Sequence, residues 1–255
     1  MIAERLVARN LKKTFGGLVV TDDVSLTLHA GERTALIGPN GAGKTTLINL
    51  LSGTVSLSSG SVALEGRCID CDPQYARVRS GLVRTFQISR LFRALSVREN
   101  VRTAVLHHAR SSMRFLLSAA ERESVERDVD EAIGLLGLQS LQDKVVSNLA
   151  LGDQRLVEIA LALALKPRVL LLDEPAAGVP QAETGRIFEA LGTLPSDLSI
   201  LLIEHDMDLV FRFARRIIVL ASGAVLVEGT PSEIAANEQV RDIYFGRSNH
   251  GIPVH

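Results

Sequence analysis

The chain has 255 residues, enough for one large domain or two small ones, and its 46% hydrophobic and 22% charged residues are typical of a globular protein. This composition excludes a disordered chain, a collagen and a small disulfide-stabilised protein. The 28 basic and 29 acidic residues, for a net charge of −1, argue against a globally basic nucleic-acid binder. No apolar run is long enough to span a membrane, and the first ten residues contain no apolar core of a signal peptide. We therefore expect a cytoplasmic location.

Short apolar strands alternate with helical segments along the chain, which predicts an α/β fold. We expect a helix from about Gly43 to Ser52 and a mainly helical block from about Ser96 to Ala164. The apolar run from Ile217 to Val227 is interrupted by Ser222 and Gly223, so it indicates two short strands joined by a turn rather than a helix. The strands are expected at residues 24–28, 35–37, 61–64, 169–172, 200–203 and 217–220.

Residues 38–45 read GPNGAGKT and match the phosphate-loop pattern G-x-x-x-x-G-K-[ST] without a mismatch. Glycines allow the backbone N–H groups to turn inward around phosphates, and the following helix directs its positive end at the anion. Lys44 adds a charge for the β and γ phosphates, and Thr45 offers a hydroxyl to Mg²⁺. An apolar strand before the motif and a helical pattern after it support a nucleotide site over a glycine-rich turn.

A buried-strand pattern, Val169 to Leu172, ends in two acids, Asp173 and Glu174. Parallel strands covered on both faces are continuously apolar, and ligands bind at their carboxyl ends. Asp173 is therefore placed to hold Mg²⁺, and Glu174 to orient or deprotonate an attacking water. A nucleotide kinase uses similar parts, so the two motifs establish phosphate chemistry without naming the phosphate acceptor.

Further segments resemble the nucleotide-binding subunits of ATP-binding cassette (ABC) transporters over residues 6–246. They are KKTFGG, GLVRTFQ, LALGDQR and LLIEH, in that order. Within that family the chain is similar to the ATPases of Liv-type importers for branched-chain amino acids. The segments on which this similarity rests are FGGLVVTDDVSL, RTFQISRLFRALSVREN, LALGDQR, DEPAAGV and IEHDMDLVF.

The resemblance implies a role for each matching residue. Phe15 would stack on adenine, for which an aromatic face is suitable, although a phenylalanine is also an ordinary core residue. Gln87 would reach Mg²⁺ and the attacking water and relay the nucleotide state, and His205 would contact the γ-phosphate. The implied catalytic residues are thus Lys44, Gln87, Glu174 and His205, and the implied Mg²⁺ ligands are Thr45, Gln87 and Asp173. The implied ATP-binding residues are Phe15, Gly38, Pro39, Asn40, Gly41, Ala42, Gly43, Lys44, Thr45 and Thr46.

The LALGDQR segment corresponds to the family signature, which clamps the γ-phosphate bound to the opposite subunit of a head-to-tail pair. The donated residues would be Ala150, Leu151, Gly152, Asp153 and Gln154. Ala150 lacks the hydroxyl of the usual serine, at a cost of about 1–3 kcal/mol for one lost donor, and Asp153 adds a negative charge. A large residue such as Leu151 is common in the Liv-type branch.

A second departure is Pro180, which stands where the family has an Asp or Asn that links the two subunits. The chain's own nucleotide-binding residues match the family, whereas the residues that it donates to a partner depart from it. We therefore expect an asymmetric head-to-tail dimer with a different ATPase chain.

The resemblance implies a P-loop NTPase core with a mainly parallel sheet, N-terminal antiparallel strands and an inserted helical subdomain. We expect one ABC ATPase domain over residues 1–255, with an α/β core at 1–87 and 160–230, a helical subdomain at 88–159, and a C-terminal helix and tail at 231–255. Its ATP hydrolysis, with Mg²⁺, would drive uptake of branched-chain or related amino acids. The expected partners are two integral-membrane permeases, the second ATPase and, indirectly, a solute-binding protein, with no nucleic acid, at the cytoplasmic face of the membrane.

Two alternatives remain open: a soluble ABC ATPase that acts on nucleic acid or ribosomes, and a weakly hydrolysing regulatory subunit. A soluble ABC ATPase is disfavoured because the sequence has no second cassette, coiled coil or basic extension. A regulatory subunit is disfavoured because Glu174 and His205 are present. Cys68 and Cys71 are interpreted as incidental thiols because no second pair accompanies them. Residues 77–114 contain nine arginines and one acid, which indicates either a solvated face or a docking surface for membrane subunits or anionic headgroups.

Overall fold

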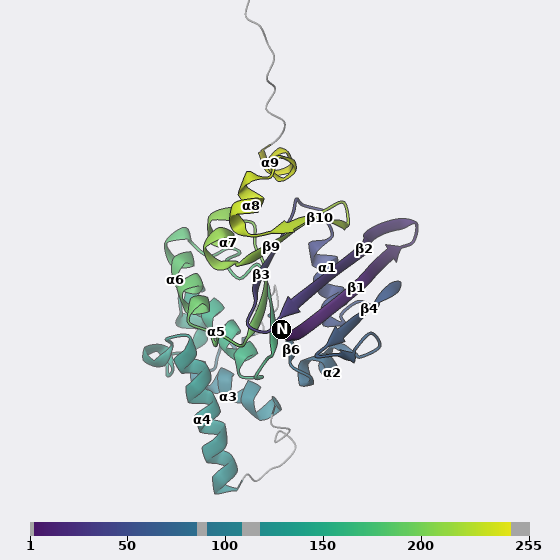
Figure 1. The fold of residues 1–255 in the computed structure, drawn as a ribbon. Coiled ribbons are helices and arrows are strands. Elements are labelled where there is room, and N and C mark those ends of the chain that lie inside the picture. Colours follow the sequence, from purple (N-terminus) through teal and green to yellow (C-terminus); the bar gives the residue numbers. More distant parts are fainter. Residues whose placement is uncertain (1–2, 86–90, 109–117, 246–255) are drawn as a thin grey trace, which may run out of the picture.

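The computed structural model describes residues 3–85, 91–108 and 118–245. Gln87 lies outside these described residues, as do parts of the RTFQISRLF segment and the end of the chain. The described residues form two β-sheets and the helices that cover them (Figure 1).

The larger sheet has six strands in the order β10-β9-β3-β8-β7-β6, of which all but the edge strand β10 run parallel. Asp173 at the end of β7 pairs with Ile203 of β8, and Leu36 of β3 pairs with the same residue. The carboxyl ends of these three strands are therefore level. The strands are β3 (Arg33–Ile37), β6 (Leu82–Arg84), β7 (Val169–Asp173), β8 (Ser199–Ile203), β9 (Arg216–Ala221) and β10 (Ala224–Gly229).

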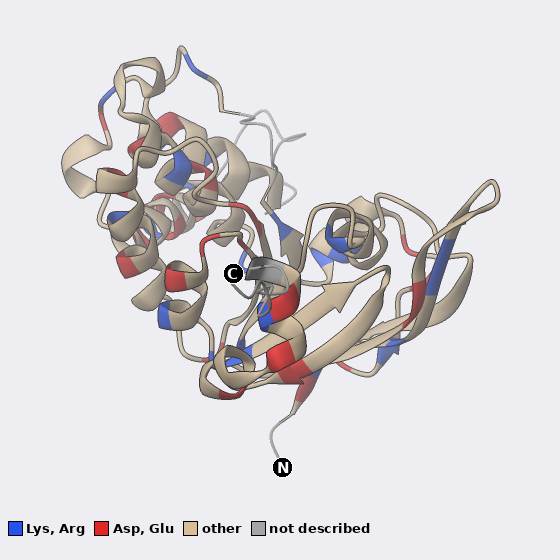
Figure 2. Cartoon of the chain, turned by 90° about the horizontal axis from the view of Figure 1, so that it is seen from above, with Lys and Arg blue, Asp and Glu red and all other residues tan. Residues whose placement is uncertain are grey.

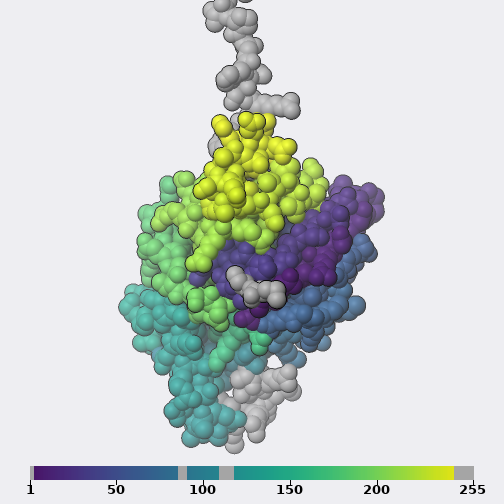
Figure 3. Space-filling model, viewed as in Figure 1, coloured from purple at the N-terminus to yellow at the C-terminus, as the bar shows by residue number. Residues whose placement is uncertain are grey.

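The smaller sheet is antiparallel, with the order β2-β1-β4-β5, and lies beside helix α1 (Lys44–Ser52) in Figure 1. Its strands are β1 (Glu4–Phe15), β2 (Leu18–His29), β4 (Ser59–Leu64) and β5 (Arg67–Cys68). In the space-filling view the N-terminal strands, in purple, lie against the C-terminal part of the chain, in yellow (Figure 3). Strand β2 packs there on β10, so both ends of the described chain contribute to the same face.

A helical segment joins β6 to β7 and extends away from the sheets (Figure 1). It contains α3 (Val97–His108), α4 (Ala119–Leu135), two 3-10 turns at Gln139–Leu141 and Val146–Asn148, and α5 (Leu151–Leu163). The other helices are α2 (Gln74–Arg79), α6 (Gln181–Gly192), α7 (Met207–Phe213), α8 (Pro231–Ala236) and α9 (Glu238–Phe245). None of the helices within the described ranges has the length and apolarity to cross a bilayer.

The alternation of side chains along the strands separates the hydrophobic core into layers. Along β7, Val169 and Leu171 pack with α1 and the antiparallel sheet, whereas Leu170 and Leu172 pack with the helical segment on the opposite face. Because both faces are covered, every residue of β7 is buried, as its unbroken apolar sequence predicted. The α/β fold with N-terminal antiparallel strands and an inserted helical segment is confirmed, as are two strands separated by a turn between residues 217 and 227.

The arginine-rich stretch at residues 77–114 is not a single exposed basic face among the residues that the structure describes. Arg77 and Arg84 are largely buried, and Arg98 and Arg102 form ion pairs with Glu126 of α4. Figure 2 shows acidic and basic residues interspersed over the helical segment. Arg77 and Arg84 are therefore not part of a solvated basic surface, because Arg77 donates to backbone carbonyls and Arg84 pairs with Asp173. Arg98 and Arg102 are 24% and 36% exposed and remain partly solvated.

Candidate functional site

The phosphate loop connects β3 to α1 and has a backbone that only glycine adopts readily. Gly38, Gly41 and Gly43 have φ angles of 155°, 78° and 97°, and the first helical residue is Lys44. A β-carbon on Gly38 would lie 2.2 Å from the carbonyl oxygen of Leu220 in β9. The motif therefore requires its glycines for two reasons: the turn itself, and the close approach of the loop to β9.

Replacing Gly38 with alanine should displace the loop from β9, because the obstacle is backbone rather than a flexible side chain. We expect a loss of about 1–3 kcal/mol in the free energy of unfolding, together with weaker ATP binding. The matched control is Gly185→Ala in α6, where a β-carbon meets nothing within 4 Å and should stabilise the helix by up to about 1 kcal/mol. Chemical denaturation and nucleotide titration measure the two effects, and equal stabilities of the two variants would contradict this prediction.

Lys44 is buried beneath the loop that it follows. Its ammonium Nζ donates to the carbonyl oxygens of Gly38 and Pro39, at 2.7 and 3.0 Å. Burial lowers the pKa of Lys44, and the negative charges of Glu174 and Asp173 oppose that shift. The structure thus brings the lysine of the phosphate loop within electrostatic reach of both acids that follow β7, whereas Thr45 remains exposed.

Asp173 is fully enclosed at the end of β7, with 1% of its side chain exposed. Its Oδ2 accepts a hydrogen bond of 2.6 Å from the guanidinium Nη2 of Arg84, the last residue of β6. The Nη1 of Arg84 donates to Oδ1 of Asn49 in α1, also at 2.6 Å. No sequence pattern marks Arg84 as part of the site, because the contact joins residues 89 positions apart.

Glu174 and His205 face each other at the ends of β7 and β8. The Oε1 of Glu174 and the Nε2 of His205 are 2.5 Å apart and share a hydrogen bond. Glu174 has a φ angle of 50°, in the left-handed region that a non-glycine residue adopts at a cost of about 1–3 kcal/mol. The backbone thus aims this carboxylate at the histidine at an energetic cost, as is common for residues with chemical roles.

Glu204 is a buried carboxylate next to this pair that the sequence analysis missed. Its two oxygens accept from the backbone N–H groups of Ala176 and His205, at 3.0 and 3.1 Å. Burial raises the pKa of Glu204, and the two amide hydrogen bonds oppose that effect. Because Ala176 follows Glu174 closely, Glu204 ties the loop after β7 to the residue that carries the imidazole.

The signature segment forms the start of α5. Ala150 occupies the N-cap without a side-chain hydrogen bond, and the N–H of Gly152 instead donates to Oε2 of Glu183 at 2.8 Å. Asp153 forms an ion pair with Arg186, so its charge is neutralised within the chain. Both partners lie on α6, which begins after Pro180. The sequence pattern identified the segment but neither of these partners.

The remaining members of the segment lie near the same helix start. Leu151 is exposed, and the side-chain amide of Gln154 donates to the carbonyl of Leu149 at 2.9 Å. Phe15 lies far from α5, at the turn between β1 and β2, and 49% of its surface is exposed. That exposure excludes the interpretation of Phe15 as an ordinary core residue, and the ammonium of Lys13 lies over the ring, 5.0 Å from its centroid. Gln87 lies outside the described residues.

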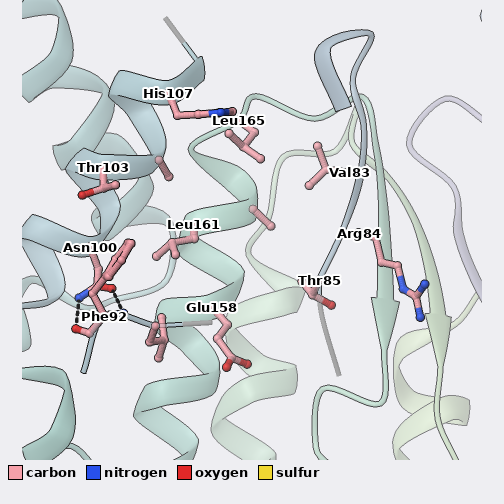
Figure 4. A pocket seen from close by; sticks show the side chains of 13 residues that line it. Val83, Arg84, Thr85, Phe92, Asn100, Thr103, His107, Glu158, Leu161 and Leu165 are labelled. Atoms are coloured by element: carbon pink, nitrogen blue, oxygen red, sulfur yellow. Dashed lines mark hydrogen bonds between the residues drawn. The ribbon is translucent and has the colours of Figure 1, made fainter. Parts of the chain in front are cut away.

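A largely apolar hollow of about 300 Å³ lies between β6, α3 and α5 (Figure 4). Leu161, Leu165 and Phe92 line it, and Asn100 fixes the backbone of Phe92 through two hydrogen bonds drawn in the figure. Val83 and Thr85 also line the hollow, whereas the guanidinium of Arg84 points away from it. The short strand β6 thus contacts the hollow on one side and Asp173 on the other.

Comparisons with known proteins found two matching family models and several close relatives. The family model described as "ABC transporter" matches residues 21–177, and the model "Branched-chain amino acid ATP-binding cassette transporter" matches residues 224–249. The chain is 40% identical to the high-affinity branched-chain amino acid transport ATP-binding protein LivG of Salmonella typhimurium, over 95% of this chain and 98% of LivG. It is 36% identical to BraF of Pseudomonas aeruginosa, over 95% of this chain and 98% of BraF.

A relative with a different transport role is similarly close. The lipopolysaccharide export system ATP-binding protein LptB of Escherichia coli K12 is 37% identical, over 94% of this chain and 97% of LptB. Among solved structures, a nucleotide-free ATP-binding cassette has a TM-score of 0.81 at 30% identity, over 94% of this chain and 98% of that one. A cassette in its ADP conformation has a TM-score of 0.82 at 29% identity, over 96% and 99%.

Proposed function

We propose that this chain, which belongs to the ABC transporter family of ATPases, uses the site at the ends of β3, β7 and β8 to power the uptake of branched-chain or related amino acids. The observation that carries the proposal is the convergence of Lys44, Asp173 and the Glu174–His205 pair at one edge of the sheet. ATP hydrolysis needs a phosphate cradle, a site for a cation and a group that handles water, and these residues provide all three.

In the proposed mechanism, the loop from Gly38 to Thr46 binds the phosphates through its backbone N–H groups, and Lys44 exchanges its carbonyl partners for β- and γ-phosphate oxygens. Glu174 accepts a proton from, or orients, the water that attacks the γ-phosphate in line with the leaving oxygen. His205 holds the Glu174 carboxylate and contacts the γ-phosphate. Phe15 stacks on the adenine, and Gln87 has the role that the family resemblance implies.

The donor set fits a magnesium ion that binds together with nucleotide. The Thr45 hydroxyl and the Asp173 carboxylate supply hard oxygen ligands, with Gln87 as the third candidate. The described part of the chain contains no cluster of three or more histidine, cysteine or acidic residues able to hold a metal. With nucleotide bound, phosphate oxygens would complete the coordination, and the ion would neutralise charge on the transferred phosphoryl group.

The support for amino acids as the transported solute comes from a short segment of the chain. LivG, BraF and LptB are nearly equally similar to this chain, so overall identity does not separate amino-acid uptake from lipopolysaccharide export. The match of residues 224–249 to the branched-chain amino acid model favours uptake. Deleting the gene should abolish high-affinity uptake of radiolabelled leucine, isoleucine or valine. Normal uptake together with a defect in lipopolysaccharide export would select the second candidate.

We further propose that the chain acts at the cytoplasmic face of the membrane with two permeases and a second, different ATPase chain. Ala150 and Pro180 offer no polar side chain to such a partner, and Asp153 is already paired with Arg186. The hollow beside Phe92 is suited to an apolar helix of a permease. Mass spectrometry of the affinity-purified complex tests the composition; recovery of ribosomal proteins without permeases would favour a soluble ABC ATPase instead.

The asymmetry has its own test in the assembled complex. The composite site built on this chain's Lys44 and Glu174 should account for most of the hydrolysis, because the site completed by this chain's signature segment lacks the usual donors. The catalytic glutamate of each ATPase chain is replaced in turn, and the remaining rate is measured. Equal residual rates would contradict an asymmetric dimer.

A further inference from the structure

The ion pair between Arg84 and Asp173 joins two buried side chains at the end of the sheet. Asp173 is 1% exposed and Arg84 10% exposed, and the 2.6 Å contact occupies one carboxylate oxygen, Oδ2. The guanidinium is also anchored to Asn49 of α1. One arginine therefore bridges the strand that carries Asp173 and the helix that begins with Lys44 and Thr45.

Such a bridge has two physical effects on a cation site. A buried carboxylate without a counter-charge is strongly disfavoured, so the arginine compensates the charge of Asp173 and holds the carboxylate in one orientation. Its planar fork reaches both partners at once, which also fixes the separation between β7 and α1. The second carboxylate oxygen, Oδ1, receives no hydrogen bond from the described residues and remains available for a cation or its water.

We infer that Arg84 is a positioning residue for Mg²⁺: it orients Asp173 relative to the helix that carries Thr45 and thereby sets the affinity of the nucleotide site for the metal. The inference rests on the proposed role of Asp173. Arg84 acts through the carboxylate that it holds. Partners that orient metal-binding groups in this way typically change metal affinity 10- to 100-fold when they are lost.

The test is binding of a fluorescent ATP analogue to the purified full-length chain, titrated with MgCl₂ and, separately, measured in EDTA. Arg84→Gln should raise, at least about tenfold, the Mg²⁺ concentration at which binding of the ATP analogue is half-maximally enhanced. In EDTA its affinity for the analogue should stay within about twofold of that of the wild type, because the phosphate loop is intact. Arg84→Lys should recover part of the loss, because an ammonium reaches only one of the two partners. Arg79→Gln, on the exposed side of α2, is the matched control and should leave both values unchanged.

A double-mutant cycle keeps the inference testable if Arg84→Gln loses stability. In an Asp173→Asn background, Arg84→Gln should shift the Mg²⁺ requirement by less than about twofold, because the arginine acts through that carboxylate. An unchanged Mg²⁺ requirement in Arg84→Gln, or equal losses with magnesium and in EDTA, would overturn the inference. A wild-type chain that binds no ATP analogue would instead overturn the proposed function.

Discussion

Replacing Glu174 with glutamine should lower the ATPase rate of the assembled transporter at least about 100-fold while ATP binding persists. Glutamine has nearly the same shape but accepts no proton at neutral pH, and it weakens the 2.5 Å contact with His205. Lys44 and the phosphate loop are untouched, so the affinity for nucleotide should change little. Turnover is measured by phosphate release from the purified complex, and affinity by nucleotide titration.

The matched control is Glu189→Gln, a neutralised carboxylate on the exposed side of α6. It removes the same charge from the chain without touching the site, so its rate should match the wild type. An unchanged rate for Glu174→Gln in the complex would favour the alternative in which this chain is a regulatory subunit and the second ATPase hydrolyses ATP. Loss of both binding and turnover would indicate damage to the fold rather than to the chemistry.

Replacing Arg77 with alanine should be the most destabilising single change among those considered, at about 3–5 kcal/mol. Arg77 is 2% exposed, and its guanidinium donates to four backbone carbonyls. The acceptors are Leu50 and Leu51 at the end of α1, and Asp70 and Asp72 in the loop between β5 and α2, at 2.7–3.0 Å. Alanine leaves a cavity and removes a hydrogen-bond donor from each of these four carbonyls, although that of Leu50 still accepts from the N–H of Gly53 at 3.3 Å.

The measurement is thermal or urea unfolding, in which a loss of this size lowers the melting temperature by roughly 6–20 °C for a chain of this length. Burial lowers the pKa of Arg77, and the charges of Asp72 and Asp70 oppose the shift. Arg79→Ala provides a control on the same helix, since that side chain is exposed and stacks on Tyr75; its effect should stay within about 0.5 kcal/mol. Equal melting temperatures for the two variants would show that the carbonyl network is dispensable.

The elements that follow from local pattern were predictable from the sequence. The run Val169 to Leu172 is apolar at every position because β7 is covered on both faces, and the glycines of the phosphate loop mark φ angles that other residues avoid. In contrast, β6 has only three residues, too few for periodicity to distinguish it from a loop. Its place in the sheet depends on pairing with β7, more than 80 residues later in the chain.

The supporting residues of the site were beyond the reach of sequence patterns for the same reason. Glu204, Glu183 and Arg84 act through partners on other elements, and each is an unremarkable charged residue in its own segment. The charge of Asp153 shows the opposite case: the sequence predicted an added negative charge at the signature segment, and Arg186 of α6 neutralises it. A sequence pattern identifies the candidate phosphate-binding residues, whereas tertiary contacts decide which charged side chains have a partner within the chain.

The close packing of the phosphate loop also constrains when the site forms as the ribosome makes the protein. The loop belongs to the first fifth of the chain, yet β3 lies between β8 and β9, and the N–H of Gly223 donates to the carbonyl of Ala42. A nascent chain that ends before these residues has the motif but neither of the two strands that flank β3 in the sheet. Because contacts so distant in sequence form late, we expect the ATP site to form only near the completion of synthesis.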